Sequence, residues 1–416
     1  MPRPSRRPSP NADVRILVLN QYFHPDRSAT SQLLTELCED LSASHQVFVV
    51  TGRPSYNAAS ATDSQGLVSR EWHDRVRVAR VWSTSFDRSN MVGRLVNYAT
   101  YLADSFVGAM FVRRPDVVVA LTDPPPVGLV GLAVARLRRR PFVLVVKDVF
   151  PDVAIELGVL QNPVAIRVLR WVQRRLFAGA DTLVSIGRDM DRRLLDLGVP
   201  RERLSTIHDW ADGSIVRPLE GPSEFREAKG WRDRFVVMHS GNVGLSQDLE
   251  TTIRAAGLLR DDPRFLFAIV GDGASKAPLQ TLADSLRLTN VEFVPFQDKA
   301  GLSESLGAAD LHLITLKPGL AGFIVPSKLY GILAAGKPYV AAMESWAEPA
   351  AIAEEHGCGI RVDPADPDAL ARVLRTLVDA DDLQERGRAG RQLFEKSFER
   401  HIAAEAYERV FARELS

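Results

Sequence analysis

The chain has 416 residues, a length that suits two domains. Of these residues 45% are hydrophobic and 25% are charged, which is typical of a soluble globular protein. No run of about 18 uncharged apolar residues occurs, so the sequence predicts no membrane-spanning helix. The two cysteines, Cys38 and Cys358, lack the spacing of a metal site and indicate a reduced, cytoplasmic setting. Residues 1–13, rich in Pro, Ser and Arg without the apolar stretch of a signal peptide, are expected to be a disordered tail.

The net charge of zero conceals an asymmetry between the two halves of the chain. Residues 1–210 contain 28 basic and 21 acidic side chains, a net charge of +7, and the remainder carries −7. Opposite charges favour different roles, with the basic half facing an anionic surface or ligand. The alternative, ordinary scatter of charges over solvated faces, is left open by the sequence.

The order of apolar segments predicts parallel sheets with helical crossovers. A strand at 14–19, a polar loop, a helical pattern at 29–41 and a strand at 46–51 make the first unit of this kind. Further strands are expected at 76–81, 117–121, 142–146, 182–186 and 205–207, and, after a polar segment at 209–222, at 235–239, 265–270, 291–293, 311–315, 339–342 and 359–362. The predicted fold class is therefore α/β, with two Rossmann-like doubly wound domains at 14–212 and 213–397 and a C-terminal helix at 398–416.

A nicotinamide-dependent enzyme of this architecture would carry a G-x-G-x-x-G loop after its first strand. The loop at 20–26 contains no glycine, and the segment 240–245 has two glycines at a different spacing. The sequence therefore argues against hydride transfer. The fold alone leaves a phosphorylase, a sugar-nucleotide epimerase and a glycosyltransferase open.

Two segments of the second half suit a phosphate group. Gly241 and Gly244 let the backbone approach a ligand, and a helix that begins near Asp248 presents unpaired N–H groups. Pro326 and Ser327 predict a second helix start, with Ser327 as N-cap.

Lys328 is expected in the first turn of this second helix, where a cation is favourable if a diphosphate is bound there. The structural alternatives are a packing turn at the two glycines and a surface position for Lys328.

Together these segments resemble a known family. Residues 241–244, 270–273, 309–310 and 326–338 resemble the C-terminal half of family 4 glycosyltransferases, which have the two-domain GT-B fold. Residues 21–26, 51–56 and 147–152 resemble the branch that contains the L-fucosamine and colanic acid biosynthesis transferases. The likeness runs from about residue 14 to residue 398.

The resemblance implies a retaining hexosyltransferase of surface polysaccharide biosynthesis. It would use a UDP-sugar, of N-acetylated or deoxy type, without a cofactor or metal ion. The residues that match the family's donor site are Gly241, Asn242, Gly244, Gly271, Gly273, Phe296, Pro326, Ser327 and Lys328. Phe323 and Gly331 stand where typical members have two glutamates, so this chain lacks those carboxylates for the ribose and the sugar.

Three residues are candidates for catalysis. Lys328 would stabilise the leaving diphosphate, which a retaining transfer requires more than it requires a strong base. Asp148 follows a strand and would orient the acceptor hydroxyl, and His24, in the glycine-free loop, is the second acceptor-side candidate. A helix-capping carboxylate and a structural loop histidine are the alternatives for these two.

The basic half also contains helical segments with arginine-rich ends at 93–114, 128–140 and 165–178, a pattern seen in helices that lie on anionic lipid. With the family resemblance, this pattern predicts a polyprenyl-diphosphate-linked glycan acceptor and peripheral contact of a cytoplasmic protein with the membrane surface. The arginines lack the interleaved aromatic residues of a nucleic-acid reader, so no nucleic-acid partner is expected. A sugar-nucleotide epimerase and a non-catalytic sugar-nucleotide binding protein stay open as alternatives.

Overall fold

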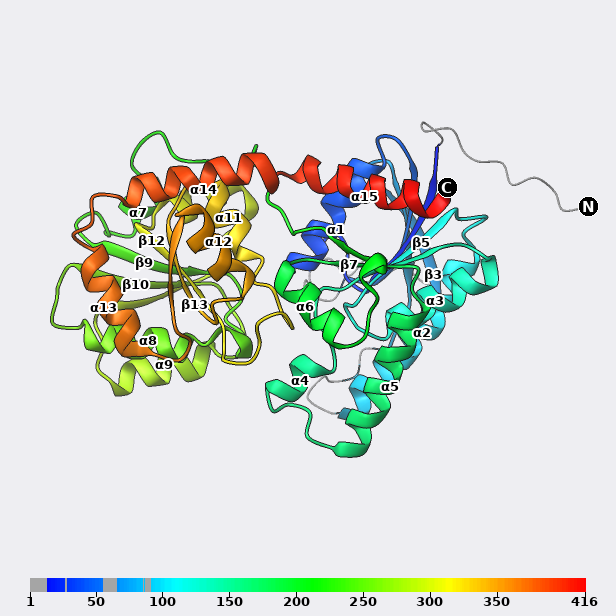
Figure 1. Ribbon diagram of the computed structural model, residues 1–416, viewed down its shortest axis with the longest axis horizontal. Helices are drawn as coiled ribbons and strands as arrows, with labels where there is room; N and C mark the ends of the chain where they lie inside the picture. The colour runs from blue at the N-terminus through cyan, green and yellow to red at the C-terminus, as the bar shows by residue number, and fades with distance from the viewer. Residues whose placement is uncertain (1–12, 27, 55–65, 85, 87–90) are drawn as a thin grey trace, which may run out of the picture. The chain divides into compact units, whose positions relative to one another are not determined.

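The computed structural model describes residues 13–26, 28–54, 66–84, 86 and 91–416, and the chain divides into two compact units (Figure 1). The first unit comprises Met1–Ile155, Leu160–His208 and His401–Ser416; the second comprises Glu156–Val159 and Asp209–Arg400. The tail expected at 1–13 lies outside the described residues except for Asp13.

The first unit is built on an eight-stranded sheet in the order β3-β4-β2-β1-β5-β6-β7-β8. All neighbours are parallel except β3 and β4, which pair antiparallel with Val68 opposite Val81. Its strands are β1 (Arg15–Leu19), β2 (Gln46–Gly52), β3 (Val68–His73), β4 (Val76–Val81), β5 (Val117–Leu121), β6 (Phe142–Val145), β7 (Thr182–Ser185) and β8 (Leu204–Thr206).

The helices of the first unit follow the strands as crossovers, and the last helix of the chain belongs with them. They are α1 (Ala29–Leu41), α2 (Met91–Met110), α3 (Val127–Arg138), α4 (Asp152–Glu156), α5 (Pro163–Gly179), α6 (Arg188–Asp196) and α15 (Arg400–Leu415). Helix α15 is bound to the first unit through Glu414, which accepts a hydrogen bond of 2.6 Å from Thr182. The structure therefore differs from the expectation of a separate C-terminal helix.

Close packing of α3 on the sheet shows why small residues are needed in this unit. Every residue of β5 is buried, and α3 places Gly131 directly over it. A Cβ on Gly131 would lie 2.7 Å from a ring carbon of Phe142 and 3.0 Å from Ala120. A larger residue at this position would force the helix away from the strands.

The second unit is built on a six-stranded parallel sheet in the order β11-β10-β9-β12-β13-β14. Its strands are β9 (Phe235–Ser240), β10 (Phe265–Val270), β11 (Val291–Val294), β12 (Leu311–Thr315), β13 (Tyr339–Ala342) and β14 (Gly359–Val362). Its helices are α7 (Glu224–Ala228), α8 (Leu249–Leu258), α9 (Lys276–Ser285), α10 (Leu302–Gly307), α11 (Lys328–Ala334), α12 (Glu348–His356), α13 (Pro367–Leu377) and α14 (Leu383–Ser397).

Strand β10 shows why the strands of this sheet consist of continuous runs of apolar residues in the sequence. Phe265 and Phe267 pack with α8 and α13 in one core cluster, whereas Leu266 and Ala268 pack on the other face with Trp231. Because successive side chains point to opposite faces and both faces are covered, all six residues of β10 are buried and apolar.

All thirteen expected strands agree with the structure to within one residue at each end, and six agree at both ends. Strand β3 was missed because residues 70–72 are exposed and polar or amphipathic, so this edge strand has no apolar alternation. None of the helices in the described ranges is long and apolar enough to cross a membrane.

Candidate active site

Two glycine loops lie side by side at the carboxyl ends of β9 and β10. Gly241 donates its N–H to the carbonyl of Val270 at 2.9 Å, and Gly271 and Gly273 have φ values of 144° and 155°. A Cβ on Gly271 would overlap the carbonyl oxygen of Gly241, and one on Gly273 would overlap that of Val243. The two loops can therefore pack backbone to backbone only because these positions are glycine.

The strand order places these loops at the point where the sheet changes direction. From β9 the chain proceeds outward through β10 and β11, then returns to β12 on the other side of β9 and continues to β13 and β14. Open α/β sheets bind ligands beyond the carboxyl ends of their strands at such a switch point. The loop after β9 leads into α8 at Leu249, and the loop after β12 leads into α11 at Lys328.

Lys328 points at the first glycine loop. Its Nζ lies 2.5 Å from Oε1 of Gln247 and 3.3 Å from Nδ1 of His239. Its Cε would lie 3.7 Å from a Cβ on Gly241. Burial lowers the pKa of Lys328 to about 7, and no carboxylate in the described part of the chain offsets that shift.

The partners of Lys328 are uncharged. His239 is fully buried, and burial, followed by the nearby Lys328, lowers the pKa of this imidazole well below its usual value. Its Nε2 lies 3.3 Å from the carbonyl of Asn242, which favours the tautomer in which Nδ1 accepts from the lysine. The ammonium therefore has hydrogen-bond acceptors but no counter-ion among the described residues, as is expected where an anionic ligand supplies the charge.

The segment before α11 differs in one respect from the expectation. Ser327 occupies the position before the helix, but its φ and ψ are −64° and −17°, in the helical region, and its side chain caps no N–H group. Ser327 is therefore the N-cap residue, as predicted, but it forms no capping hydrogen bond through its side chain. The preceding Pro326 is buried, and the helix is followed by Gly336 at φ 64°, a left-handed position that suits glycine.

The structure also locates the other predicted donor-side residues. Phe296 follows β11 and is 49% exposed, so its ring is accessible to a base. Phe323 and Gly331 are partly buried, and a Cβ on Gly331 would meet only Leu306 at 3.6 Å. Neither position can supply a carboxylate.

Two charged residues near this edge were not predicted from the sequence. Lys276 begins α9 and donates from Nζ to the carbonyl of Gly271 at 3.2 Å, which brings a second ammonium to the glycine loops. Glu344, just beyond β13, accepts a hydrogen bond of 2.6 Å from the N–H of Gly319. The sequence contained a signal for Lys276, because this lysine lies in the first turn of a helix that follows a G-x-G loop.

In the first unit, Asp148 lies at the carboxyl end of β6, as predicted. Its N–H and that of Lys147 lie 3.3 Å and 2.9 Å from the hydroxyl oxygen of Thr122, which follows β5. Burial raises the pKa of Asp123, the residue after Thr122, and the positive charge of Lys147 limits this rise. This edge therefore combines two carboxylates and one ammonium on neighbouring strands.

His24 belongs to a different group of side chains. Its N–H donates to Oγ1 of Thr35 at 3.1 Å, its carbonyl accepts from Arg80 at 2.6 Å, and its ring stacks on His73 with centroids 4.3 Å apart. Burial, then His73 and Arg80, lowers the pKa of His24, so the imidazole is neutral at neutral pH. The hydrogen bonds and the ring contact of His24 are with Thr35, Arg80 and His73, which places it in a group other than that of Asp148.

Known family models match both halves of the chain. The model of the glycosyl transferase 4-like domain matches residues 29–210, and that of glycosyl transferases group 1 matches residues 223–392. The glycosyltransferase WbjE of Pseudomonas aeruginosa is 33% identical over 303 residues, which cover 71% of this chain and 74% of WbjE. The Escherichia coli protein named as colanic acid biosynthesis glycosyl transferase WcaI is 28% identical over 384 residues, 87% of this chain and 91% of WcaI.

Solved structures share the fold at low identity. Anabaena Alr3699/HepE, crystallised with UDP and glucose, has a TM-score of 0.73 at 18% identity and covers 96% of this chain and 100% of its own. WaaG, a glycosyltransferase involved in lipopolysaccharide biosynthesis, has a TM-score of 0.68 at 15% identity and covers 95% and 99%. With two family models matched in chain order and a relative at 33% identity over 71% of the sequence, the chain belongs to the family 4 glycosyltransferases and has the GT-B fold.

Proposed function

We propose that this glycosyltransferase transfers a sugar from a UDP-sugar, with retention of anomeric configuration, to a polyprenyl-diphosphate-linked glycan in surface polysaccharide biosynthesis. The second unit would bind the donor diphosphate through its two glycine loops and Lys328. The observation that carries the proposal is the ammonium of Lys328, held 2.5 Å from Gln247 against the first glycine loop with no carboxylate of the described residues beside it. The choice of UDP is supported by Anabaena HepE, which has the same fold and was crystallised with UDP and glucose.

The chemistry follows from charge. As the bond between the anomeric carbon and the diphosphate oxygen breaks, negative charge grows on the leaving group, and an ammonium placed there stabilises the transition state more than the bound donor. The acceptor oxygen forms the new bond on the same face, and its proton passes to the leaving diphosphate. Lys328 supplies the positive charge that a metal ion could otherwise supply, so we propose a transfer step without a metal ion.

The acceptor side is assigned to the first unit. Asp148, at the carboxyl end of β6, would accept a hydrogen bond from the attacking hydroxyl and orient it. A role in surface polysaccharide biosynthesis is supported by WcaI, whose name assigns it to colanic acid biosynthesis.

An exposed face of α5 supports contact with a membrane surface. Val164, Val168 and Trp171 lie on one face of this helix and are 65%, 54% and 53% exposed. Arg167 and Arg175 lie beside this stripe and are also exposed. An apolar stripe with arginine and tryptophan beside it is the pattern of a helix that lies in the interface of an anionic bilayer.

The transfer itself is tested with a panel of UDP-sugars and a polyprenyl-diphosphate glycan as acceptor. We expect a glycolipid product whose new linkage has the anomeric configuration of the donor, read by nuclear magnetic resonance. A product of inverted configuration would refute retention. Conversion of the UDP-sugar into another UDP-sugar without acceptor would instead identify an epimerase.

Membrane contact is tested by flotation with anionic vesicles at low salt. We expect Trp171→Glu to reduce the bound fraction, and Leu258→Glu, at a 45% exposed apolar position of α8 in the second unit, to leave it unchanged. Failure of the unaltered protein to float with the vesicles would refute the membrane proposal, and this result would have no bearing on the proposed donor site.

A further inference from the structure

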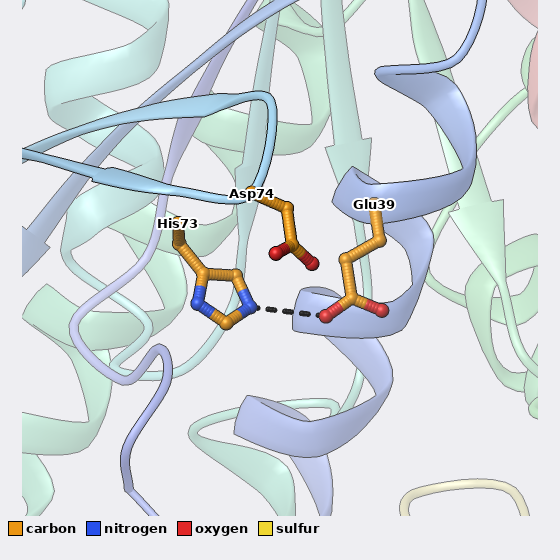
Figure 2. A group of neighbouring side chains, drawn as sticks. All are labelled: Glu39, His73 and Asp74. Atoms are coloured by element: carbon orange, nitrogen blue, oxygen red, sulfur yellow. Dashed lines mark hydrogen bonds and ion pairs between the residues drawn. The ribbon is translucent and has the colours of Figure 1, made fainter.

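Three potential metal ligands meet at the tip of the β3–β4 hairpin. His73 ends β3, Asp74 forms the turn that follows, and Glu39 lies on the last turns of α1 (Figure 2). Nε2 of His73 lies 3.0 Å from Oε1 of Glu39, and one ligand atom from each of the three residues lies within 4.8 Å of the other two. Figure 2 shows both carboxylates turned toward the same side of the imidazole.

Local structure explains why these side chains converge. The antiparallel register pairs His73 with Val76, so Asp74 is in the tight turn between them. Asp74 has a φ of 49°, a left-handed conformation that aspartate tolerates better than most residues. Glu39 approaches from a separate element whose first residue is capped by Ser28, which accepts from the N–H of Ser31 at 3.2 Å.

The imidazole is held in place before any ligand binds. His24 stacks on one face of the His73 ring at 4.3 Å, and Phe23 contacts it edge-on at 5.9 Å and 87°. The side chains of His73 and Glu39 are 20% and 27% exposed. Ligands whose orientation is already fixed lose less conformational entropy when they coordinate an ion.

The charge of the group matches a divalent cation. With the imidazole in the neutral form that coordinates a metal, the two carboxylates give the group a charge of −2, and Asp74 makes no ion pair with any lysine or arginine of the described ranges. The nearby Arg80 is engaged by Glu71, at 2.5 Å, and by the carbonyl of His24. Asp74 is exposed, so an ion can reach the group from solvent.

From this geometry we propose that Glu39, His73 and Asp74 bind a divalent transition-metal ion. One nitrogen and two oxygen ligands form a set that Zn²⁺ accepts, with water completing the coordination. The ion would link the β3–β4 hairpin to α1, and through His73 it would also hold His24. The site is separate from the donor loops, which belong to the second unit, and it does not depend on the proposed transfer reaction.

The test is equilibrium dialysis of the full chain, first stripped with chelator, against Zn²⁺. We expect one Zn²⁺ per chain, and a visible absorption band of low-symmetry Co²⁺ when Co²⁺ is used instead. His73→Gln and Asp74→Asn should each raise the dissociation constant by about tenfold or more. Asparagine also tolerates the left-handed conformation of Asp74, so the second variant keeps the turn.

His45→Gln is the matched control. His45 lies beside one carboxylate, with its Nε2 3.7 Å from Glu408, and no third ligand joins this pair among the described residues, so this variant should bind Zn²⁺ as the unaltered chain does. The proposal is overturned if the chain binds no Zn²⁺ when the concentration of free Zn²⁺ is well above the concentration of the protein. It is equally overturned if binding survives both His73→Gln and Asp74→Asn, because the ion then binds elsewhere.

Discussion

The near-neutral pKa of Lys328 makes donor binding depend on pH. In the free protein burial lowers the pKa of this lysine to about 7, so the fraction of molecules that carry the ammonium falls as the pH rises above 7. A bound diphosphate favours the charged form and raises the pKa. Because the charged form binds, the affinity for a UDP-sugar falls as the pH rises above 7, by up to about tenfold per pH unit.

Replacement of the lysine separates the charge from the rest of the site. Lys328→Met keeps the length of the side chain and removes the charge, and we expect its affinity for a UDP-sugar to be weaker and nearly independent of pH between 7 and 9. Its kcat should fall about 100-fold, because one contact to a developing charge contributes about 3 kcal/mol. Calorimetric titrations at several pH values, together with initial rates, measure both quantities.

Lys317→Met provides the control for this series. Lys317 is on the same loop between β12 and α11, is exposed, and contributes its backbone N–H to the carbonyl of Ser246 at 2.9 Å, which the substitution leaves intact. We expect this variant to retain the pH dependence of the unaltered protein. The assigned role would be refuted if the affinity of the unaltered protein for the UDP-sugar did not change with pH. It would also be refuted if Lys328→Met bound the UDP-sugar at pH 7 as tightly as the unaltered protein does.

Three further substitutions test the packing of the donor loops and the acceptor side. Gly271→Ala should lower the free energy of unfolding by more than about 1 kcal/mol in urea titrations, because its φ is 144° and its Cβ would overlap the carbonyl of Gly241. Gly331→Ala should raise it by about 0.5–1 kcal/mol, since the added Cβ lies in a helix interior, 3.6 Å from Leu306. Asp148→Asn should lower kcat while leaving the calorimetric affinity for the UDP-sugar unchanged. A weakened affinity for the UDP-sugar would instead indicate that Asp148 contacts the donor.

The central strands of both sheets were predictable because burial on both faces leaves a strong compositional pattern. Strands such as β5 and β10 consist of apolar residues only, and polar or glycine-containing loops separate them from the helices. The position of Lys328 in the first turn of α11 was also predictable, because Pro326 and Ser327 mark a helix start; that this lysine binds an anion stays a prediction. Its neutral partners His239 and Gln247 were not, because they reach it from β9 and the following loop across the sheet edge.

Features that depend on long-range register were not predictable. Glu39 and His73 are 34 positions apart, and only the pairing of β3 with β4 brings the hairpin tip to α1. The same reason applies to α15, whose sequence shows an amphipathic helix but not which unit it joins. Periodicity describes which face of an element is buried, whereas the partner of that face is decided by the whole fold.

The two missing glutamates and the lysine with a near-neutral pKa have a common consequence for specificity. With Phe323 and Gly331 in place of carboxylates, neither position can recognise a ribose or sugar hydroxyl by accepting its hydrogen bond. Under the proposed function, recognition then falls on the diphosphate, through Lys328, and on the base, through the exposed ring of Phe296. A site of this kind should discriminate poorly between nucleotides that differ only in the 2′-hydroxyl, because neither Phe323 nor Gly331 has a side-chain acceptor that would be left unpaired when that hydroxyl is absent. Deoxyuridine and uridine diphosphates should therefore stabilise the protein to similar extents in thermal shift measurements, and a clear preference for the ribonucleotide would require a carboxylate such as Glu344 to act in place of the missing pair.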